Sequence, residues 1–153
     1  MSIEEEIKQV SFKDERQKAL INILYTSHFL EERIRTFLSP EGLTHQQFNV
    51  LRILRGSYPK PLSTMQIRAR MIDKMSDTSR IVERLVKKEL AQKKICPDDK
   101  RLVDVKITRK GIEKLRNLDA MEEDLMSMLS HLSENKLMSI NTLMDELRHK
   151  PEG

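Results

Sequence analysis

Two arginines in the stretch SDTSRIVERLVKKELAQKKICPDDKRLVDVKIT, residues 76–108, have the spacing of a nucleic-acid contact. Arg80 and Arg84 are one helical turn apart, so both side chains leave the same face of a helix. A guanidinium group at such a position can contact a guanine edge or a phosphate. Short polar residues at the start of this helix allow a close approach and offer hydrogen bonds to base edges and phosphates. These residues are Ser76, Asp77, Thr78 and Ser79.

A second basic pair lies in the charged turn 97–101, where Lys100 and Arg101 follow two aspartates. An arginine in a turn suits the narrow and strongly negative minor groove of DNA. We also include Ser63 and Gln66, at the start of the preceding helix, in the predicted DNA interface.

The charge distribution agrees with this hypothesis. Residues 60–110 contain fifteen Lys and Arg against seven Asp and Glu, a formal charge of +8, whereas the rest of the chain carries −4. A segregated positive segment attracts a phosphate backbone. A solvated charged surface without a partner is the alternative interpretation.

Other chemistry finds little support in the sequence. The four histidines lack the spacing of a metal site, although folding could bring His28 close to acidic residues of the long helices. Cys96, the only cysteine, is predicted to be a small, partly buried strand residue, and the nearby Lys93 and Lys94 could lower its pKa. Neither a phosphate-binding glycine loop nor a catalytic triad can be specified. We therefore predict a non-enzyme without metal or cofactor.

Helical periodicity places these side chains on defined elements. Apolar residues repeat at helical spacing over residues 12–38, and the Ser-Pro-Glu-Gly sequence at 39–42 ends that helix. Thr44 with Gln47, and Ser63 with Gln66, form two capping-box patterns that start the next two helices. A fourth helix is expected from about residue 76 to 89. Two short helices joined by a tight turn indicate a helix-turn-helix.

Beyond residue 90 the apolar period changes from 3.6 to 2. Val103, Val105 and Ile107 share one face of a predicted strand, and Ile95 supplies a matching apolar residue on the strand before it. No third strand is evident, and two strands alone are marginally stable, so this hairpin must pack against the helices. Thr108 is predicted to cap a final helical section, in which Ser133 restarts the helix.

The terminal helices carry apolar stripes that the short central module cannot cover. Because only 38% of the residues are hydrophobic, we expect these stripes to pair across a two-fold axis in a homodimer, with an intramolecular core as the alternative. The predicted dimerisation residues are Leu20, Ile23, Leu24, Ile140, Leu143 and Leu147. The absence of a long apolar run or a basic leader predicts a soluble cytoplasmic protein without membrane contact.

The motifs LTHQQFNVLRIL, PLSTMQIRARM, SDTSRIVERLVKKELAQKK and PDDKRLVDVKITRKG, followed by a helical tail, resemble a MarR-family transcriptional regulator over nearly the entire chain. The resemblance implies a mainly α fold with a small β-hairpin wing, a winged helix-turn-helix flanked by N- and C-terminal dimerisation helices. In a single domain, 1–153, the DNA-binding core would span 44–108 and the dimerisation helices 12–38 and 109–150. It also implies that Arg101 reaches the minor groove.

Two positions depart from the family pattern. Glu89 replaces the glycine that commonly follows the recognition helix, so we expect this helix to end differently and the wing to sit at a shifted angle. The turn RARMIDKMSD lacks the usual leucine and glycine residues, which leaves the N-cap of the recognition helix open between Asp73 and Ser76.

The predicted function is sequence-specific binding of double-stranded DNA by a homodimeric repressor. The resemblance implies a pseudo-palindromic operator and release by a small anionic aromatic effector. The alternatives are a winged-helix protein-interaction module and a non-specific architectural DNA-binding protein. The effector, its binding residues, the operator sequence and the sign of regulation do not follow from the sequence.

Overall fold

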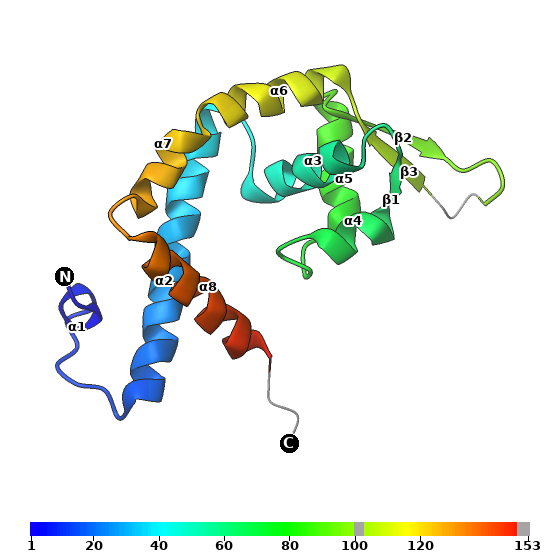
Figure 1. Cartoon of the computed structure of the whole chain (residues 1–153). Helices are drawn as coiled ribbons and strands as arrows, with labels where there is room; N and C mark the ends of the chain where they lie inside the picture. The colour runs from blue at the N-terminus through cyan, green and yellow to red at the C-terminus, as the bar shows by residue number, and fades with distance from the viewer. Residues whose placement is uncertain (100–102, 150–153) are drawn as a thin grey trace. The chain divides into compact units, whose positions relative to one another are not determined.

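A computed structural model describes residues 1–99 and 103–149, and these fall into two compact units, Met1–Leu118 and Asp119–Gly153. The first unit contains most of the secondary structure (Figure 1). Its elements are α1 (Ile3–Glu6), α2 (Glu15–Leu38), η1 (Ser39–Glu41), α3 (His45–Ser57), β1 (Leu62–Ser63), α4 (Thr64–Arg70), α5 (Thr78–Lys87), β2 (Ala91–Ile95), β3 (Val103–Ile107) and α6 (Arg109–Ala120), whose last two residues extend beyond this unit.

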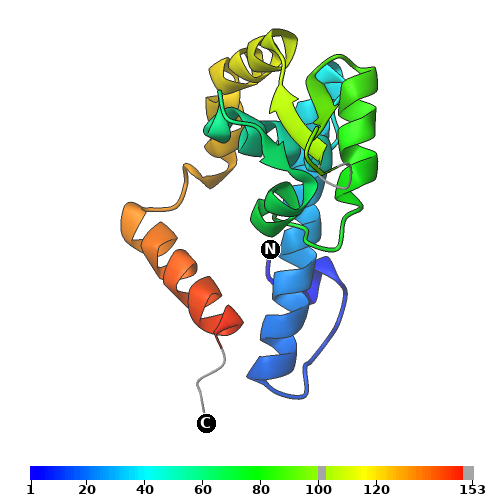
Figure 2. The same cartoon turned by 90° about the vertical axis from the view of Figure 1, so that its right-hand side faces the viewer.

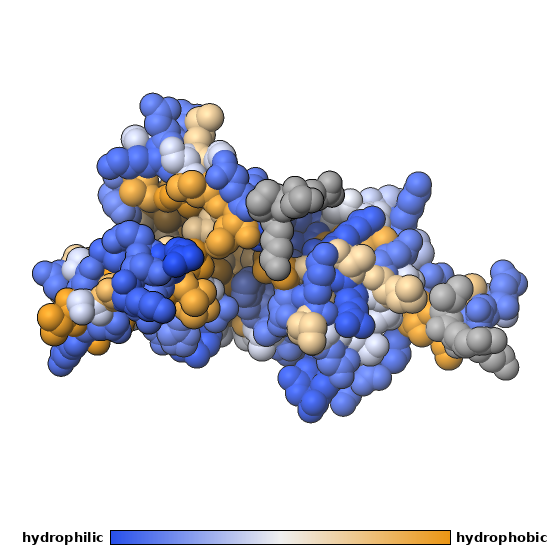
Figure 3. All heavy atoms as spheres, turned by 90° about the horizontal axis from the view of Figure 1, so that it is seen from below, coloured by the Kyte–Doolittle hydropathy of each residue, from blue (hydrophilic) through white to orange (hydrophobic). Residues whose placement is uncertain are grey.

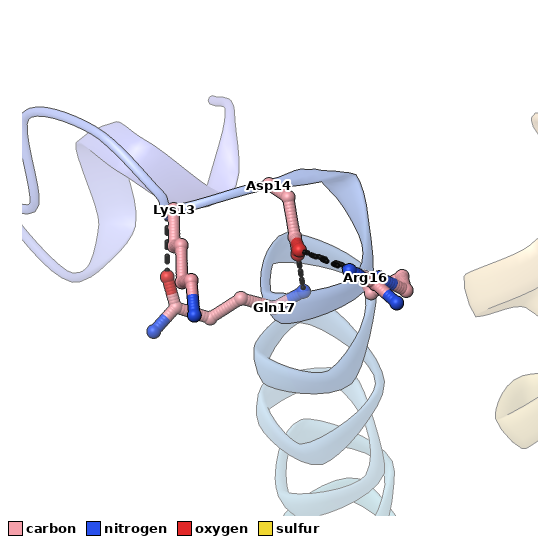
Figure 4. A network of polar contacts seen from close by, with 4 residues as sticks. All are labelled: Lys13, Asp14, Arg16 and Gln17. Carbon is pink, nitrogen blue, oxygen red and sulfur yellow. Dashed lines mark hydrogen bonds and ion pairs between the residues drawn. The ribbon is translucent and has the colours of Figure 1, made fainter.

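The predicted long N-terminal helix is α2, which starts three residues later than periodicity suggested. Asp14 is its N-cap and accepts a hydrogen bond from the Gln17 amide at 2.9 Å, while the Gln17 side chain accepts one from the Lys13 amide at 2.7 Å (Figure 4). These bonds satisfy backbone donors that a helix start leaves unpaired. The short helix α1, which was not expected, is joined to α2 by the Lys18–Glu4 ion pair at 2.6 Å and by the Tyr25 hydroxyl, which donates to the Glu6 carboxylate at 2.8 Å.

The helix-turn-helix is formed by α4 and α5, packed against α3. Both predicted capping boxes are confirmed, at the starts of α3 and α4. The core lies between these three helices, the sheet and α6 (Figures 1 and 2). Its fully buried large side chains are Leu38, Leu51, Leu54, Ile67, Leu85, Leu90, Leu115 and Leu118.

The small sheet differs from the prediction in its number of strands. The hairpin of β2 and β3 is confirmed, with Ile95 opposite Val103, but β1 adds a third antiparallel strand on the other side of β3. Since β1 has only two residues, it shows no alternating pattern in the sequence. The central strand β3 turns Val105 and Ile107 into the core, as its alternation predicted.

Glu89 does not alter the end of α5 in the expected way. It adopts the left-handed conformation, with φ 60°, that a glycine would adopt at this position. The Leu90 amide donates to the Leu85 carbonyl at 3.0 Å, and the Glu89 amide donates to the Val86 carbonyl at 2.9 Å. This pair of bonds is a Schellman motif. The expectation of a different helix end was therefore wrong, because backbone hydrogen bonds hold a non-glycine residue in the same geometry.

The junction between β3 and α6 depends on Thr108 and Gly111. The Thr108 hydroxyl accepts a hydrogen bond from the Gly111 amide at 3.1 Å, which confirms its capping role, and donates one to the Glu89 carbonyl at 2.7 Å. A Cβ atom on Gly111 would lie only 2.3 Å from the Leu90 carbonyl oxygen. Only glycine allows α6 to approach the start of β2 this closely.

The second unit contains α7 (Glu122–Met126), η2 (Ser127–Leu129) and α8 (Glu134–Arg148). The predicted final helical section is thus broken into short elements, and the last helix restarts after Ser133 as expected. None of the helices in the described part of the chain combines the length and hydropathy needed to span a membrane.

Candidate nucleic-acid interface

The helix α5 presents its two arginines on the face opposite the core. Val82 and Leu85 are buried, whereas Arg80 and Arg84 are exposed. The 3.6-residue period separates these two sets of side chains because all four lie on one regular helix. The structure thus brings both arginines together on one solvent-facing surface, as their spacing predicted.

The N-cap of α5 is Asp77, not Asp73 or Ser76. The Asp77 carboxylate accepts a hydrogen bond from the Arg80 amide at 3.1 Å. Asp73 instead orders the loop before the helix, since its carboxylate accepts from the Ser76 hydroxyl at 2.7 Å and from the Met75 amide at 2.9 Å. Both bonds stabilise the charged carboxylate, and the bond from the Ser76 hydroxyl has the larger effect. They hold the pKa of the Asp73 carboxyl below its ordinary value.

Thr78 does not lie on the exposed surface of α5. Its side chain is buried, and its hydroxyl lies 3.4 Å from the Met71 sulfur. The sequence grouped Thr78 with Ser76, Asp77 and Ser79 because all four are short and polar. Ser79 is exposed on the folded helix, whereas Ser76 orders the preceding loop and Asp77 caps the helix.

Ser63 and Gln66 lie at the start of α4 and bond to each other. The Ser63 hydroxyl accepts from the Gln66 amide at 3.2 Å, and the Gln66 side chain accepts from the Ser63 amide at 2.9 Å. Gln66 is exposed and Ser63 is half-buried. Their role in the structure is therefore the capping box, and Gln66 remains exposed.

Part of the basic segment serves the fold rather than the surface. The Lys88 ammonium donates to the buried Gln47 side chain at 2.9 Å and to the Gly42 carbonyl, which joins the end of α5 to the start of α3. Lys93 lies 3.6 Å from Glu83. A count of charges along the sequence could not separate such residues from free ones. Lys100 and Arg101 lie outside the described residues.

A pocket that the sequence did not indicate lies beside the helix-turn-helix, with a volume of about 640 Å³. Its walls come from α2, from the start of α3 and from the loop after α4. Asn49 supports that loop by accepting a hydrogen bond from the Ile72 amide at 2.9 Å. The lining side chains include His28, Glu31, Glu32, Arg35, Leu43, His45, Asn49, Met71, Ile72 and Asp73.

His28 and two glutamates of α2 do line this pocket together, as the sequence left open. Across residues 1–99 and 103–149, however, no group of three or more His, Cys, Asp and Glu side chains is arranged to hold a metal ion.

Comparison with known proteins finds similarity to one family. The model of the MarR family matches residues 43–103, which include α3, the helix-turn-helix and the strand β2. The crystal structure of a MarR transcription factor from Planctomyces limnophilus is 27% identical, with a TM-score of 0.70 over 88% of this chain and 98% of that chain. These matches support a MarR-family winged-helix regulator. Members of this family are DNA-binding transcription regulators and not enzymes.

Two more distant structures share the fold of this chain. A mutant of MarR from E. coli, complexed with operator DNA, is 22% identical, with a TM-score of 0.74 over 83% of this chain and 91% of that chain. The organohalide-sensing regulator RdhR, in its 2,4-dichlorophenol-bound form, is 19% identical, with a TM-score of 0.80 over 92% of this chain and 85% of that chain. A comparison with curated protein sequences found no match.

Proposed function

We propose that this protein is a homodimeric repressor that binds a pseudo-palindromic operator and is released by a small-molecule effector. The observation that carries the proposal is the exposed face of α5, where Arg80 and Arg84 stand opposite the buried Val82 and Leu85. A helix with this arrangement can lie in the major groove while its other face remains packed in the protein.

In this proposal Arg80 and Arg84 contact guanine edges or phosphates, and Ser79 and Gln66 add hydrogen bonds. Ser63, Ser76 and Asp77 contribute through the helix starts that they cap or order. Thr78 has no direct contact, because its side chain is buried. Lys100 and Arg101 keep the wing role that the family resemblance implies, with Arg101 in the minor groove and Lys100 at a phosphate.

The dimer would form through residues 12–38 and 109–150, which flank the DNA-binding core 44–108 within one MarR-like domain, 1–153. On α2, Leu20 and Leu24 are 59% and 62% exposed, and on α8 both Leu143 and Leu147 are 61% exposed. Ile140 is exposed as well, whereas Ile23 is half-buried. Figure 3 shows apolar side chains, in orange, at the molecular surface. Large apolar side chains repeated along one helix favour a protein partner, and a second copy supplies the same surface.

The pocket between α2, α3 and the loop after α4 is the proposed effector site. Leu43, Met71 and Ile72 offer apolar surface, while Arg35 and His45 offer hydrogen-bond donors to an acidic aromatic compound. The dichlorophenol bound to RdhR supports this class of ligand. Asp73 both lines the pocket and orders the loop that leads into α5, so a ligand in contact with it would disturb the start of the recognition helix.

The operator half-sites provide the test. DNA selected from a random pool should contain a pseudo-palindrome with half-sites about 10 base pairs apart, since adjacent major grooves recur on one side of the duplex at that interval. Inserting about five base pairs between the half-sites turns one groove to the far side, and affinity should fall by at least about ten-fold in a titration at fixed salt. A scrambled duplex serves as the control.

Equal affinity for the spaced and unspaced sites would exclude readout by a dyad. If the scrambled duplex bound as tightly as the selected one, the protein would instead be a non-specific architectural DNA-binding protein.

A further inference from the structure

The most exposed large apolar side chains between residues 39 and 99 lie close together in the sequence, on α4 and in the loop that leads to α5. Met75 is 89% exposed, Met65 79% and Ile72 76%. Single exposed apolar residues are common and need no explanation. Here, however, they lie in the helix-turn-helix, just before the helix that carries Arg80 and Arg84.

The loop that carries Met75 is held by several hydrogen bonds. The Met75 amide donates directly to the Asp73 carboxylate at 2.9 Å, and the Arg68 guanidinium donates to the Lys74 carbonyl at 3.2 Å. The Ser76 amide donates back to the Asp73 carbonyl at 3.3 Å. The exposed thioether is therefore attached to a backbone of defined geometry, which a specific contact requires.

The charges around Met75 indicate its partner. Arg68, Arg70, Lys74 and Arg80 surround it in the sequence, and all four are exposed. The acidic residues between them, Asp73 and Asp77, are engaged in hydrogen bonds of the loop and of the N-cap. An apolar side chain among these cations fits a polyanion that presents apolar groups. The major groove of DNA does so at each thymine, through its C5-methyl group.

We propose that Met75 reads a thymine of the operator half-site by contact with this methyl group. A thioether side chain is flexible and polarisable, so it can fill the space around a methyl group without a polar partner. The inference rests on the proposed operator binding, and it adds a base that neither arginine would read, because arginine prefers the acceptors of guanine.

Deoxyuridine provides the test, since it differs from thymidine only by the missing methyl group. Each thymine of the selected half-site is replaced singly, and the dissociation constants of the wild type, Met75→Ala and the control Val10→Ala are measured at one salt concentration. Val10 is 98% exposed and lies outside the proposed dimer interface and the DNA-binding core. For the wild type and Val10→Ala, one replacement should weaken binding about four-fold, the effect of one buried methyl group. For Met75→Ala, that same replacement should have no effect.

The inference is overturned if the wild type tolerates every replacement, or if Met75→Ala responds to the same thymine as strongly as the wild type. Equal binding of selected and scrambled DNA by the wild type would overturn the proposed function as well. Unfolding midpoints of the two variants, expected to match the wild type because both side chains are exposed, show that the fold is intact.

Discussion

At the scale of single residues, the effect of adding a side chain at a glycine depends on the atoms that surround it. Gly111 lies where the Leu90 carbonyl leaves no space for a Cβ atom, whereas no atom lies within 4 Å of the Cβ position of Gly56 in α3. Both glycines lie in helices, Gly56 near the end of α3 and Gly111 in the first turn of α6, and the space around them differs. The comparison separates the packing role of a glycine from its low helix propensity.

Gly111→Ala should lower the free energy of unfolding by about 2 kcal/mol or more, because α6 must move away from Leu90 and Ile107. Gly56→Ala, the matched control, should raise it by roughly 0.5 to 1 kcal/mol through helix propensity. Urea unfolding followed by circular dichroism measures both. A neutral Gly111→Ala variant would show that the close approach is not required.

The pKa of Asp73 predicts how the free energy of unfolding depends on pH. Its pKa is lowered in the folded state, so its contribution to stability is fully present above the ordinary value of 3.8 and is lost as the pH falls through the lower, folded-state pKa. The difference in unfolding free energy between the wild type and Asp73→Asn should therefore narrow as the pH falls below 3.8. Urea titrations at pH values from neutral to acidic provide the measurement. A difference that widened at low pH would contradict the assigned hydrogen bonds.

At the scale of secondary-structure elements, the end of α5 decides how the wing is connected. A Schellman motif closes the helix although its left-handed residue is glutamate. The carboxylate of Glu89 lies 3.1 Å from the Lys110 ammonium, but both side chains are largely exposed, so the pair adds little stability. The free-energy cost of the left-handed backbone at Glu89 is therefore larger than the stabilisation from its ion pair with Lys110.

Glu89→Gly should raise the free energy of unfolding by about 1 kcal/mol, since glycine adopts positive φ without steric conflict. Glu89→Ala removes the same carboxylate but keeps the Cβ atom, and it should give no such gain. Thermal and urea unfolding of the three proteins compare these effects. Equal stability of the Gly and Ala variants would mean that the left-handed conformation is not strained.

At the scale of the whole molecule, α2 and α8 each carry large apolar side chains that are exposed, among them Leu20 and Leu24 on α2 and Leu143 and Leu147 on α8. Their exposure fits association of two copies, and two recognition helices related by a dyad would then read two half-sites. Dimerisation and operator recognition should therefore be lost together.

Replacing Leu20, Leu24 and Leu143 with glutamate should give a monomer that retains its helical circular dichroism and loses most of its operator affinity, because charge at an apolar interface opposes association. Sedimentation velocity at micromolar protein measures the oligomeric state. Val10→Glu is the control, since Val10 is 98% exposed and lies outside α2 and α8. A triple variant that remained dimeric would place the interface elsewhere.

The sequence by itself determined the features that depend on neighbours within a few residues. The capping boxes at Thr44 and Ser63, the helical period of α5 and the alternation in β3 were all predicted correctly, because the interacting groups are three or four residues apart or alternate along one strand. The resemblance to the MarR family could be inferred for the same reason, since the motifs that carry it are local.

Only the tertiary structure decided what depends on distant neighbours. The strand β1 exists because β3 lies beside it, Thr78 is buried because Met71 and the core lie on its side of α5, and the pocket forms where α2, α3 and the loop after α4 meet. Glu89 could adopt the left-handed conformation because the end of α5 and the Thr108 hydroxyl both hold its backbone. The free energy of such contacts is supplied by residues far away along the chain, so no short stretch of sequence contains them.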